Sequence, residues 1–561
     1  MRWCSALVAC LTVGLTAQTT YSIHGTVTNS ATGTAIRRAL VQSGSAAVFT
    51  DSDGRFELTH LKAGEARVTV RKPGFFGSVR RSVDLPMMAT ARVQVTADTP
   101  ALVLTLVPSA SFAGRVTGPG DEPLEHVMVR VFRRRIVEGR SQWQPFNGAQ
   151  TDEEGNYRIT GLQPDHYVVA ATAQAPVAIP ADRKIQAQAF PLQTYFPGVG
   201  ERDAASVMDL AGGREFQADF SLRKERAFRI AGTIAGAIDA SRVSIQLALP
   251  DGQQPRIGGR LRDGQFEFPP VPAGDYEVIA QSNDGKRHSS TARQSIHLSA
   301  DTDHLVLKLS STLLRLYANV ERAEARPSVE VETGEPPFPV DVRFLTSGPS
   351  RFGATSKETD AEGKEMLSIF GPPQGRHNIQ FDPMEGLYVA SAVCGDTDLL
   401  RDPLTIAEGA ETPPIKVTLR DGTATLKFRF DGGLPDGGAT LLIAHDSAPT
   451  QTPFTLEVSR QGMLILEPPL LVDPAEMRDT DPPRADVPEA NNAANSASND
   501  QRQLTNLAPG DYTIYAFDDL SDLEYAKPDT LLPYSADAVH VHVDRAGSTD
   551  VSVKVIRREK K

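Results

Sequence analysis

The chain has 561 residues and a formal net charge of −12, from 58 Lys and Arg against 70 Asp and Glu. One hydrophobic core seldom serves more than about 250 residues, so several domains are expected. An acidic chain without long basic runs argues against a nucleic-acid partner, because phosphates are neutralised by clustered Lys and Arg.

The first seventeen residues, MRWCSALVACLTVGLTA, place one Arg ahead of an apolar run that ends in small residues. This order is typical of a secretory signal peptide over 1–17, with cleavage after Ala17. Residues 7–10 (LVAC) also fit a bacterial lipoprotein cleavage box, so lipidation at Cys10 stays open as an alternative. No later segment reaches the roughly 18 apolar residues that cross a bilayer. We therefore expect export to the periplasm, the outer cell surface or the medium, with no transmembrane span in the mature chain.

One phrase recurs along the chain. Its copies are TDSDGRFELTHLKAGEARVTV from residue 50, TDEEGNYRITGLQPDHYVV from residue 151 and RDGQFEFPPVPAGDYEVIA from residue 262. After the turn glycines Gly54, Gly155 and Gly264, an aromatic residue follows at two positions and apolar residues follow at four and seven. A spacing of two places side chains on one face of a strand, and the glycine supplies the positive φ of a tight turn. The phrase therefore predicts β-hairpins with one buried face.

Each hairpin is preceded by an opening strand that contains a glycine: IHGTV, FAGRV and FRIAGTI. Two degenerate copies follow, DAEGKEMLSIFGPPQGRHNIQF near residue 360 and LTNLAPGDYTIYAF near residue 504. Residues 473–503 are polar and rich in Pro, Asn and Asp, so we expect them to form a disordered insertion.

The expected fold is all-β, a tandem array of about five antiparallel Ig-like or transthyretin-like β-sandwiches after the signal peptide. The expected domains are 18–107, 108–222, 223–312, a degenerate fourth at 313–421 and a degenerate fifth at 422–561. Cys394 is the single cysteine outside the signal, so the stability of these domains is expected to come from their cores and not from disulfides.

The opening G-x-V strands and the pattern D-x-x-G-x-[FY]-x-[LI]-x-x-L-x-x-G resemble the carboxypeptidase regulatory-like domain, a transthyretin-like sandwich of seven strands. The resemblance covers the first three domains and part of the last two. The third copy has Leu261 where the others have Asp before the turn, so that Asp is not expected to perform chemistry. The resemblance implies an accessory domain in a tandem array of an exported bacterial protein.

No catalytic signature is evident in the sequence. None of the eleven His is followed three residues later by Glu, and both HExxH and the GxSxG nucleophile elbow are absent. Cys394 lies in AVCGDTD without a nucleophile signature, which favours an incidental or buried thiol. We expect no enzyme activity, no catalytic residues, no metal and no cofactor. An alternative stays open: a peptidase, another hydrolase or an accessory subunit with an unrecognised site in the fourth or fifth domain.

Three groups of residues are candidate metal sites. Asp51 and Asp53 begin like a calcium loop, but Arg55 and Lys62 stand where further oxygen ligands are required, which favours a plain turn. The other two groups are His540 with His542 in VHVHV, and the acidic residues Asp518, Asp519, Asp522 and Glu524. Without a further ligand in view, an exposed strand face and solvated loop carboxylates are favoured for these two groups.

Aromatic residues supply the candidate ligand site. Trp143, Phe146, Tyr195 and Phe196 are predicted to form a platform on which a sugar ring can lie, with rings packed beneath a loop as the alternative. The function expected from the sequence is therefore a non-catalytic exported protein that binds or scaffolds at the bacterial cell envelope. Its expected partner is a polysaccharide or a cell-envelope protein.

Overall fold

A computed structural model describes most of the chain. The described residues are 20–78, 87–173, 187–236, 243–250, 256–283, 289–309, 313–322, 338–345, 354–370, 375–407, 412–435, 438–459, 462–465, 502–520 and 522–558. The predicted signal peptide with Cys10 and Ala17 lies outside them, as do residues 473–501 of the predicted insertion. The last two residues of that insertion, Arg502 and Gln503, begin a strand.

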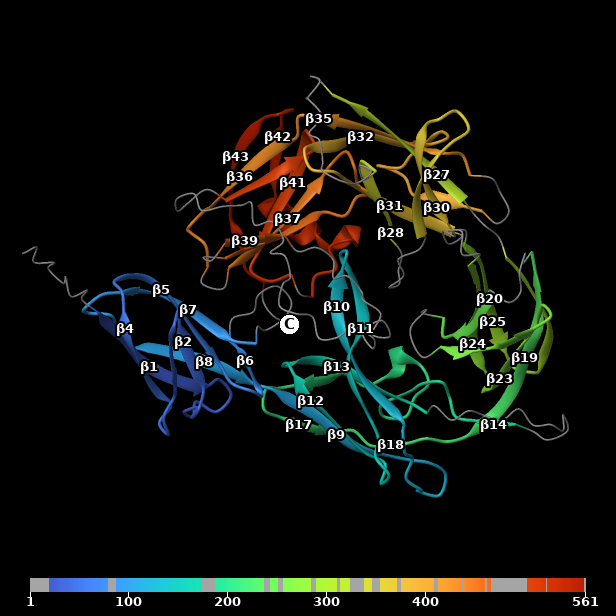
Figure 1. The fold of residues 1–561 in the computed structure, drawn as a ribbon, viewed down its shortest axis with the longest axis horizontal. Coiled ribbons are helices and arrows are strands. Elements are labelled where there is room, and N and C mark those ends of the chain that lie inside the picture. The colour runs from blue at the N-terminus through green and yellow to red at the C-terminus, as the bar shows by residue number, and fades with distance from the viewer. Residues whose placement is uncertain are drawn as a thin grey trace, which may run out of the picture. The chain divides into compact units, whose positions relative to one another are not determined.

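The described chain is built from strands, with short 3₁₀ helices as its helical elements (Figure 1). The strands form sheets that group into five successive pairs along the sequence, and we call these pairs modules one to five. The prediction of an all-β chain made of about five sandwiches is confirmed. The chain divides into two compact units, the first with residues 1–112, 158–165 and 209–217 and the second with the others.

Module one has two sheets, in the strand orders β4-β1-β8-β6 and β3-β2-β5-β7. Its strands are β1 (Tyr21–Asn29), β2 (Leu40–Ser43), β3 (Ala46–Phe49), β4 (Arg55–Leu61), β5 (Gly64–Arg71), β6 (Phe75–Gly77), β7 (Ala89–Val95) and β8 (Leu102–Pro108). The aromatic and apolar positions of the repeated phrase, Phe56, Leu58 and Leu61, are buried in its core.

Module two has the sheets β12-β9-β17, with β18 beside β9, and β11-β10-β13-β15, with β16 beside β13. Its elements are β9 (Ala110–Thr117), β10 (Met128–Val137), β11 (Arg140–Gln150), β12 (Asn156–Leu162), β13 (Asp165–Thr172), β15 (Thr194–Tyr195), η1 (Arg202–Ala204), β16 (Met208–Leu210), β17 (Glu215–Gln217) and β18 (Phe220–Ser221). The short strand β14 (Gln188–Ala189) lies within the expected second domain but pairs with β19 of module three.

Module three has the sheets β14-β19-β23-β22, with β26 beside β19, and β21-β20-β24-β25. Its further strands are β19 (Glu225–Ala235), β20 (Val243–Ala248), β21 (Ile257–Gly258), β22 (Arg260–Arg262), β23 (Gln265–Pro272), β24 (Gly274–Asn283), β25 (Ser289–Leu298) and β26 (Thr302–Lys308). Phe266 and Phe268 of the repeated phrase lie together in its core, with ring centroids 5.9 Å apart.

Module four has the sheets β29-β30-β27-β35-β32-β33 and β28-β31-β34. Its strands are β27 (Leu313–Glu321), β28 (Val340–Leu345), β29 (Ala354–Thr359), β30 (Glu365–Phe370), β31 (Gly375–Pro383), β32 (Leu387–Cys394), β33 (Thr397–Asp398), β34 (Leu404–Ile406) and β35 (Ile415–Asp421). The apolar residues of both sheets, among them Leu316 and Phe381, form one core.

Module five has the sheets β40-β36-β43 and β39-β38-β37-β41-β42, with β44 beside β41. Its elements are β36 (Ala424–Phe430), β37 (Ala439–His445), β38 (Phe454–Ser459), β39 (Gly462–Ile465), β40 (Arg502–Leu507), β41 (Gly510–Phe517), η4 (Pro528–Thr530), η5 (Leu532–Asp537), β42 (Val539–Val543), β43 (Ser548–Val553) and β44 (Val555–Ile556). Although its copy of the phrase is degenerate, this module closes a core of its own.

The modules share one pairing scheme. The opening strand runs parallel to the closing strand of the same module, and it also pairs with the strand that follows the phrase's first turn. The parallel pairs are β1 with β8, β9 with β18, β19 with β26, β27 with β35 and β36 with β43. The repetition of the phrase therefore reflects a repetition of this pairing.

The aspartates of the phrase stabilise turns. The Asp51 carboxylate accepts hydrogen bonds from the backbone N–H groups of Asp53 (2.9 Å) and Arg55 (2.8 Å). Asp360 does the same in the degenerate fourth copy, and bonds from the backbone of the turn, that of Lys364 first, lower the pKa of its carboxyl. An Asp that bonds its own turn has a structural role there.

A tyrosine closes the second turn of the phrase in modules three and five. The hydroxyl of Tyr276 donates to the Pro272 carbonyl at 2.9 Å, and that of Tyr512 donates to the Ala508 carbonyl at 2.6 Å. Both rings are buried, and this burial raises the pKa of each phenol, so both hydroxyls remain protonated donors.

We expect Tyr512→Phe to lower the free energy of unfolding of module five by about 1–2 kcal/mol, because the Ala508 carbonyl loses its buried donor while the ring still fills its site. Urea denaturation of the whole chain, with hydrogen exchange followed over β41, measures the change. An unchanged exchange rate in β41 would show that this hydroxyl contributes nothing to the turn.

Candidate functional site

The predicted aromatic residues lie in separate surroundings. Trp143 is half-buried beside a cluster that contains Phe132 and Tyr195, and Tyr195 is only 2% exposed. Trp143 pairs with Arg134 on the neighbouring strand β10, while Phe132 pairs with Pro145. Trp143 and Tyr195 therefore lie in one packed cluster, in which Tyr195 is buried and Trp143 is partly buried.

Phe146 lies apart from this cluster. Its ring is 38% exposed, its centroid is 6.2 Å from that of Tyr167, and the Arg133 guanidinium lies 5.5 Å above it. Trp143 packs beside Phe132, whereas Phe146 lies beneath Arg133, and Phe132 and Arg133 are neighbours on β10. Because neighbouring residues of a strand point to opposite faces, Trp143 and Phe146 lie on opposite faces of the sheet.

Phe196 has a third set of neighbours. Its ring packs edge-on against Phe220 of β18 at a centroid distance of 6.0 Å. Of the four residues predicted to share one platform, the structure thus groups Trp143 with Tyr195 and places Phe146 and Phe196 elsewhere. A sugar-binding role for these rings stays a prediction.

The candidate metal-site residues form hydrogen bonds and ion pairs within the protein. Nδ1 of His542 is 2.7 Å from an Asp511 carboxylate oxygen, and this bond raises the pKa of the imidazole. Asp522 pairs with Arg558 at 2.6 Å, and Glu524 pairs with Lys527 at 2.6 Å. Among the described residues, no group of three or more His, Cys, Asp or Glu is arranged to hold a metal ion.

Cys394 is buried at the end of β32. Its thiol donates to the Pro413 carbonyl at 3.2 Å, and burial raises the pKa of the thiol. Because the thiolate is the nucleophilic form, a raised pKa disfavours a catalytic role.

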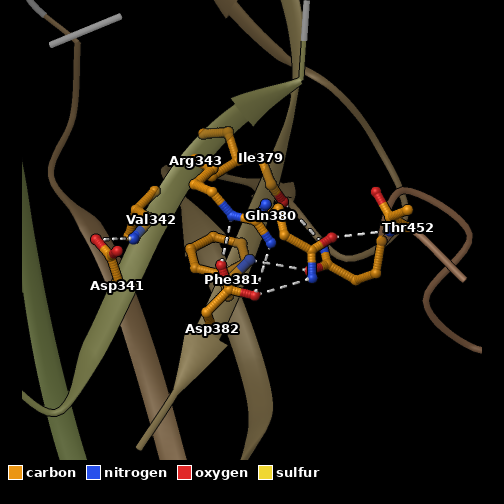
Figure 2. Close-up of polar contacts among 9 residues, drawn as sticks. Asp341, Val342, Arg343, Ile379, Gln380, Phe381, Asp382 and Thr452 are labelled. Atoms are coloured by element: carbon orange, nitrogen blue, oxygen red, sulfur yellow. Dashed lines mark hydrogen bonds and ion pairs between the residues drawn. The ribbon is translucent and has the colours of Figure 1, made fainter. Parts of the chain in front are cut away.

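A group of polar contacts joins module four to the loop of module five between β37 and β38. Figure 2 shows its centre, where Arg343 of β28 and Asp382 of β31 face one another. The guanidinium donates to both carboxylate oxygens, at 2.7 and 3.2 Å. Partial burial works to lower the pKa of Arg343, but the bond and charge of Asp382 outweigh it and hold the pKa above its usual value.

The loop of module five binds the backbone of β31 through the Gln451 side chain. Its Nε2 donates to the Ile379 carbonyl at 2.8 Å, and its Oε1 accepts from the Phe381 N–H at 3.1 Å. Gln451 therefore occupies the donor and acceptor positions that a neighbouring strand would otherwise fill.

The residues on either side of Gln451 extend this contact. The Thr452 N–H donates to the Gln380 Oε1 at 2.8 Å, as Figure 2 shows. The Thr450 hydroxyl is buried and donates to the Leu399 carbonyl at 2.7 Å. The contact from Thr450 to Thr452, which we call the Gln451 joint, fixes module five against two separate segments of module four.

A second contact connects the same two modules. Arg545, between β42 and β43, donates to an Asp421 carboxylate oxygen at 2.8 Å and to the Asp421 carbonyl at 3.2 Å. Two contacts at separate places restrict rotation between neighbouring modules more than either contact alone. The arrangement is suited to holding an orientation, and its polar groups are satisfied by one another.

Sequence reasoning missed the Gln451 joint. Gln451 stands in HDSAPTQTPF, a polar loop outside the repeated phrase, and its partners are about 70 residues away in the sequence. No local pattern marks such a residue, because its role depends on which backbone groups approach it.

Paired sheets, antiparallel for the most part but with the opening and closing strands parallel in each module, define the class of this protein, a chain of β-sandwich modules. Residues 22–98 match the family model of the carboxypeptidase regulatory-like domain, which confirms the family predicted for the first module. No curated protein matches the chain. Among the described residues, none of the helices has the length and apolar character required to cross a membrane.

Solved structures of low similarity include two streptococcal pilins and the Bacillus anthracis TIE protein. The Streptococcal ancillary pilin is 11% identical, with 52% of this chain and 99% of that chain covered and a TM-score of 0.17. The Bacillus anthracis TIE protein is 11% identical, with 72% and 68% covered and a TM-score of 0.15. The minor pilin GBS52 of Streptococcus agalactiae is 12% identical, with 36% and 96% covered and a TM-score of 0.18. At these TM-scores the similarity carries no argument about the function of this chain.

Proposed function

We propose that this chain is a non-catalytic scaffold of the bacterial cell envelope, exported through its signal peptide and composed of sandwich modules held in defined orientations. The observation that supports this proposal most directly is the Gln451 joint, in which a side chain of module five pairs with strand backbone of module four. A scaffold needs its modules held at fixed angles, and hydrogen bonds to backbone groups supply directional restraint.

The test compares binding of the chain to cell-envelope material with its hydrolysis of small substrates. Purified mature chain is incubated with cell-envelope fractions and, separately, with peptide and ester substrates. We expect saturable retention on the envelope material and no hydrolysis above the blank. Hydrolysis that co-purifies with the chain and follows its concentration would instead favour the alternative, a hydrolase with its site in module four or five.

A polysaccharide is the ligand class that we propose for this scaffold. The proposal is supported by the half-buried Trp143, whose neighbours Phe132 and Tyr195 hold it in place at the edge of a packed cluster. Rigid aromatic rings offer contact area to a sugar at little cost in conformational entropy.

Trp143 is the single Trp outside the predicted signal peptide, so its fluorescence reports on its surroundings. We expect envelope polysaccharide to change the emission of Trp143, and Trp143→Ala to weaken binding by about tenfold, a loss of about 1.4 kcal/mol. Phe49→Ala, which removes a 64% exposed ring from module one, is the matched control and should leave binding intact. Binding that is unaffected by Trp143→Ala would remove this residue from the ligand site.

A further inference from the structure

The hairpin formed by β10 and β11 ends in an unusual turn. Val137 and Arg140 form its last pair, so the turn consists of Glu138 and Gly139. Their φ angles are +50° and +75°, the left-handed region that a two-residue hairpin turn of this type requires. Asn, Asp or Gly normally occupies the first of these positions, and a residue as long as Glu is uncommon there. A strained backbone conformation persists where the surrounding structure holds it, so we expect the tip to contact another part of the chain.

The segment between β41 and β42 of module five lies outside the repeated sandwich pattern. Its residues Leu520 and Leu523 are buried in a cluster with Tyr515 and Phe517 on the module-five sheet. Tyr525 is partly buried and packs against the same cluster. This apolar packing gives residues 522–527 a firm base, and we call these residues the dock.

The hairpin tip contacts the dock through backbone groups. The Ala526 N–H donates to the Gly139 carbonyl at 3.0 Å. On the other side of the turn, the Ser141 N–H donates to the Glu524 carboxylate at 3.1 Å. The Arg134 guanidinium, three residues before the end of β10, lies 4.0 Å from the same carboxylate. Ser141 and Glu524 are 383 positions apart in the sequence.

Gly139 fits the dock because it has no side chain. A Cβ at this position would lie 2.6 Å from the Ala526 backbone N and 2.6 Å from the Tyr525 ring. Real Cβ atoms do not approach backbone this closely, so the space is available to glycine alone. The tip and the dock are therefore complementary in shape as well as in hydrogen bonding.

We infer that the β10–β11 hairpin is an intramolecular latch, whose tip (Glu138 and Gly139) binds the dock and ties module two to module five. The occupant of the dock is a segment of the same chain, recognised by backbone hydrogen bonds and by the absence of a Cβ. This inference goes beyond the proposed scaffold function, and it holds whatever ligand the scaffold binds.

The latch is expected to respond to pH. Burial raises the pKa of Glu138, in spite of the opposing charges of Arg343 and Arg140, and the Asp382 carboxylate adds to the rise. Glu138 in turn contributes, after burial, to the raised pKa of Tyr525, which is about 12. Releasing the tip returns Glu138 to its ordinary pKa, so the bound state holds more protons between the two pKa values. Glu138 therefore tightens the latch as pH falls through that range and loosens it as pH rises. Glu524 acts in the opposite direction at lower pH, because Lys527 first, and then Ser141 and Arg134 across the latch, lower the pKa of its carboxyl.

Hydrogen exchange in the whole chain tests the latch, because the amides of Ser141 and Ala526 are both hydrogen-bonded across it. We expect Gly139→Ala to accelerate exchange at both amides, relative to their intrinsic rates, by at least about tenfold. Gly44→Ala is the matched control, because Gly44 also lies in a hairpin turn with φ of +55° but a Cβ there meets nothing within 4 Å. This control should leave exchange at Ser141 and Ala526 unchanged.

A second variant separates the latch from damage to the turn itself. Glu524→Gln keeps the shape of the dock but removes the charge that Ser141 and Arg134 face, and we expect faster exchange at Ser141 with β10 and β11 still protected. Glu138→Gln should remove the part of the pH dependence that comes from Glu138 and leave the opposing part that comes from Glu524. Unchanged exchange at both amides in Gly139→Ala and Glu524→Gln would overturn the latch. A concentration-dependent dimer that Gly139→Ala dissociates would also overturn it, since the dock would then bind a second copy.

Discussion

Gly232→Ala is expected to lower the free energy of unfolding of module three by about 3 kcal/mol, near the upper end for overpacking a core. A Cβ at this position would lie 2.2 Å from the Leu305 carbonyl oxygen and 2.7 Å from the Phe266 ring. The first of these contacts is to backbone of the closing strand and cannot be relieved by a rotamer change. β26 must therefore move away from β19, and the Phe266 ring must shift within the core as well.

Urea denaturation of the whole chain, with hydrogen exchange followed over β19 and β26, measures this loss. Gly258→Ala is the matched control in the same module, since a Cβ at Gly258 meets nothing within 4 Å. Equal effects from the two substitutions would contradict the explanation, because of these two glycines only Gly232 has a crowded Cβ site. The same crowding holds at Gly25 and Gly114, where a Cβ would lie 2.2 and 2.1 Å from a carbonyl oxygen.

Gln451→Leu is expected to weaken the contact between modules four and five by about 2–4 kcal/mol. The substitution keeps the approximate size of the side chain but leaves the Ile379 carbonyl and the Phe381 N–H without their partners, at about 1–3 kcal/mol for each buried group. The cores of the two modules do not include this residue, so each module should remain folded.

Two measurements follow this change. Exchange at the Phe381 amide should become faster, and small-angle scattering should show a broader distribution of sizes as the joint loosens. Gln265→Leu, at an exposed position of β23, removes a Gln without touching a joint and serves as the control. If Gln451→Leu leaves both measurements at their original values, the Arg545 contact with Asp421 is enough to hold the two modules.

The aromatic residues show where sequence reasoning about a site stops. Trp143 and Phe146 are close in sequence and are predicted to share a surface, but they pack on opposite faces of the sheet. Their spacing in the sequence does not decide this, because the register shift opposite Val131 and Phe132 of β10 falls at Phe146 and interrupts the alternation of β11. The shift depends on how two strands meet, so it could not be read from the sequence.

The sequence by itself determined the elements whose causes are local. The turn glycines, such as Gly54 with φ of +70°, the Asp51 turn and the alternation of buried residues after each turn depend on a few consecutive residues, so a short pattern was enough to predict them. The tertiary structure alone decided the Gln451 joint, the placement of β14 in module three and the contact of Gly139 with Ala526. Each of these depends on backbone groups from distant segments meeting in space, and no short stretch of sequence records which groups will meet.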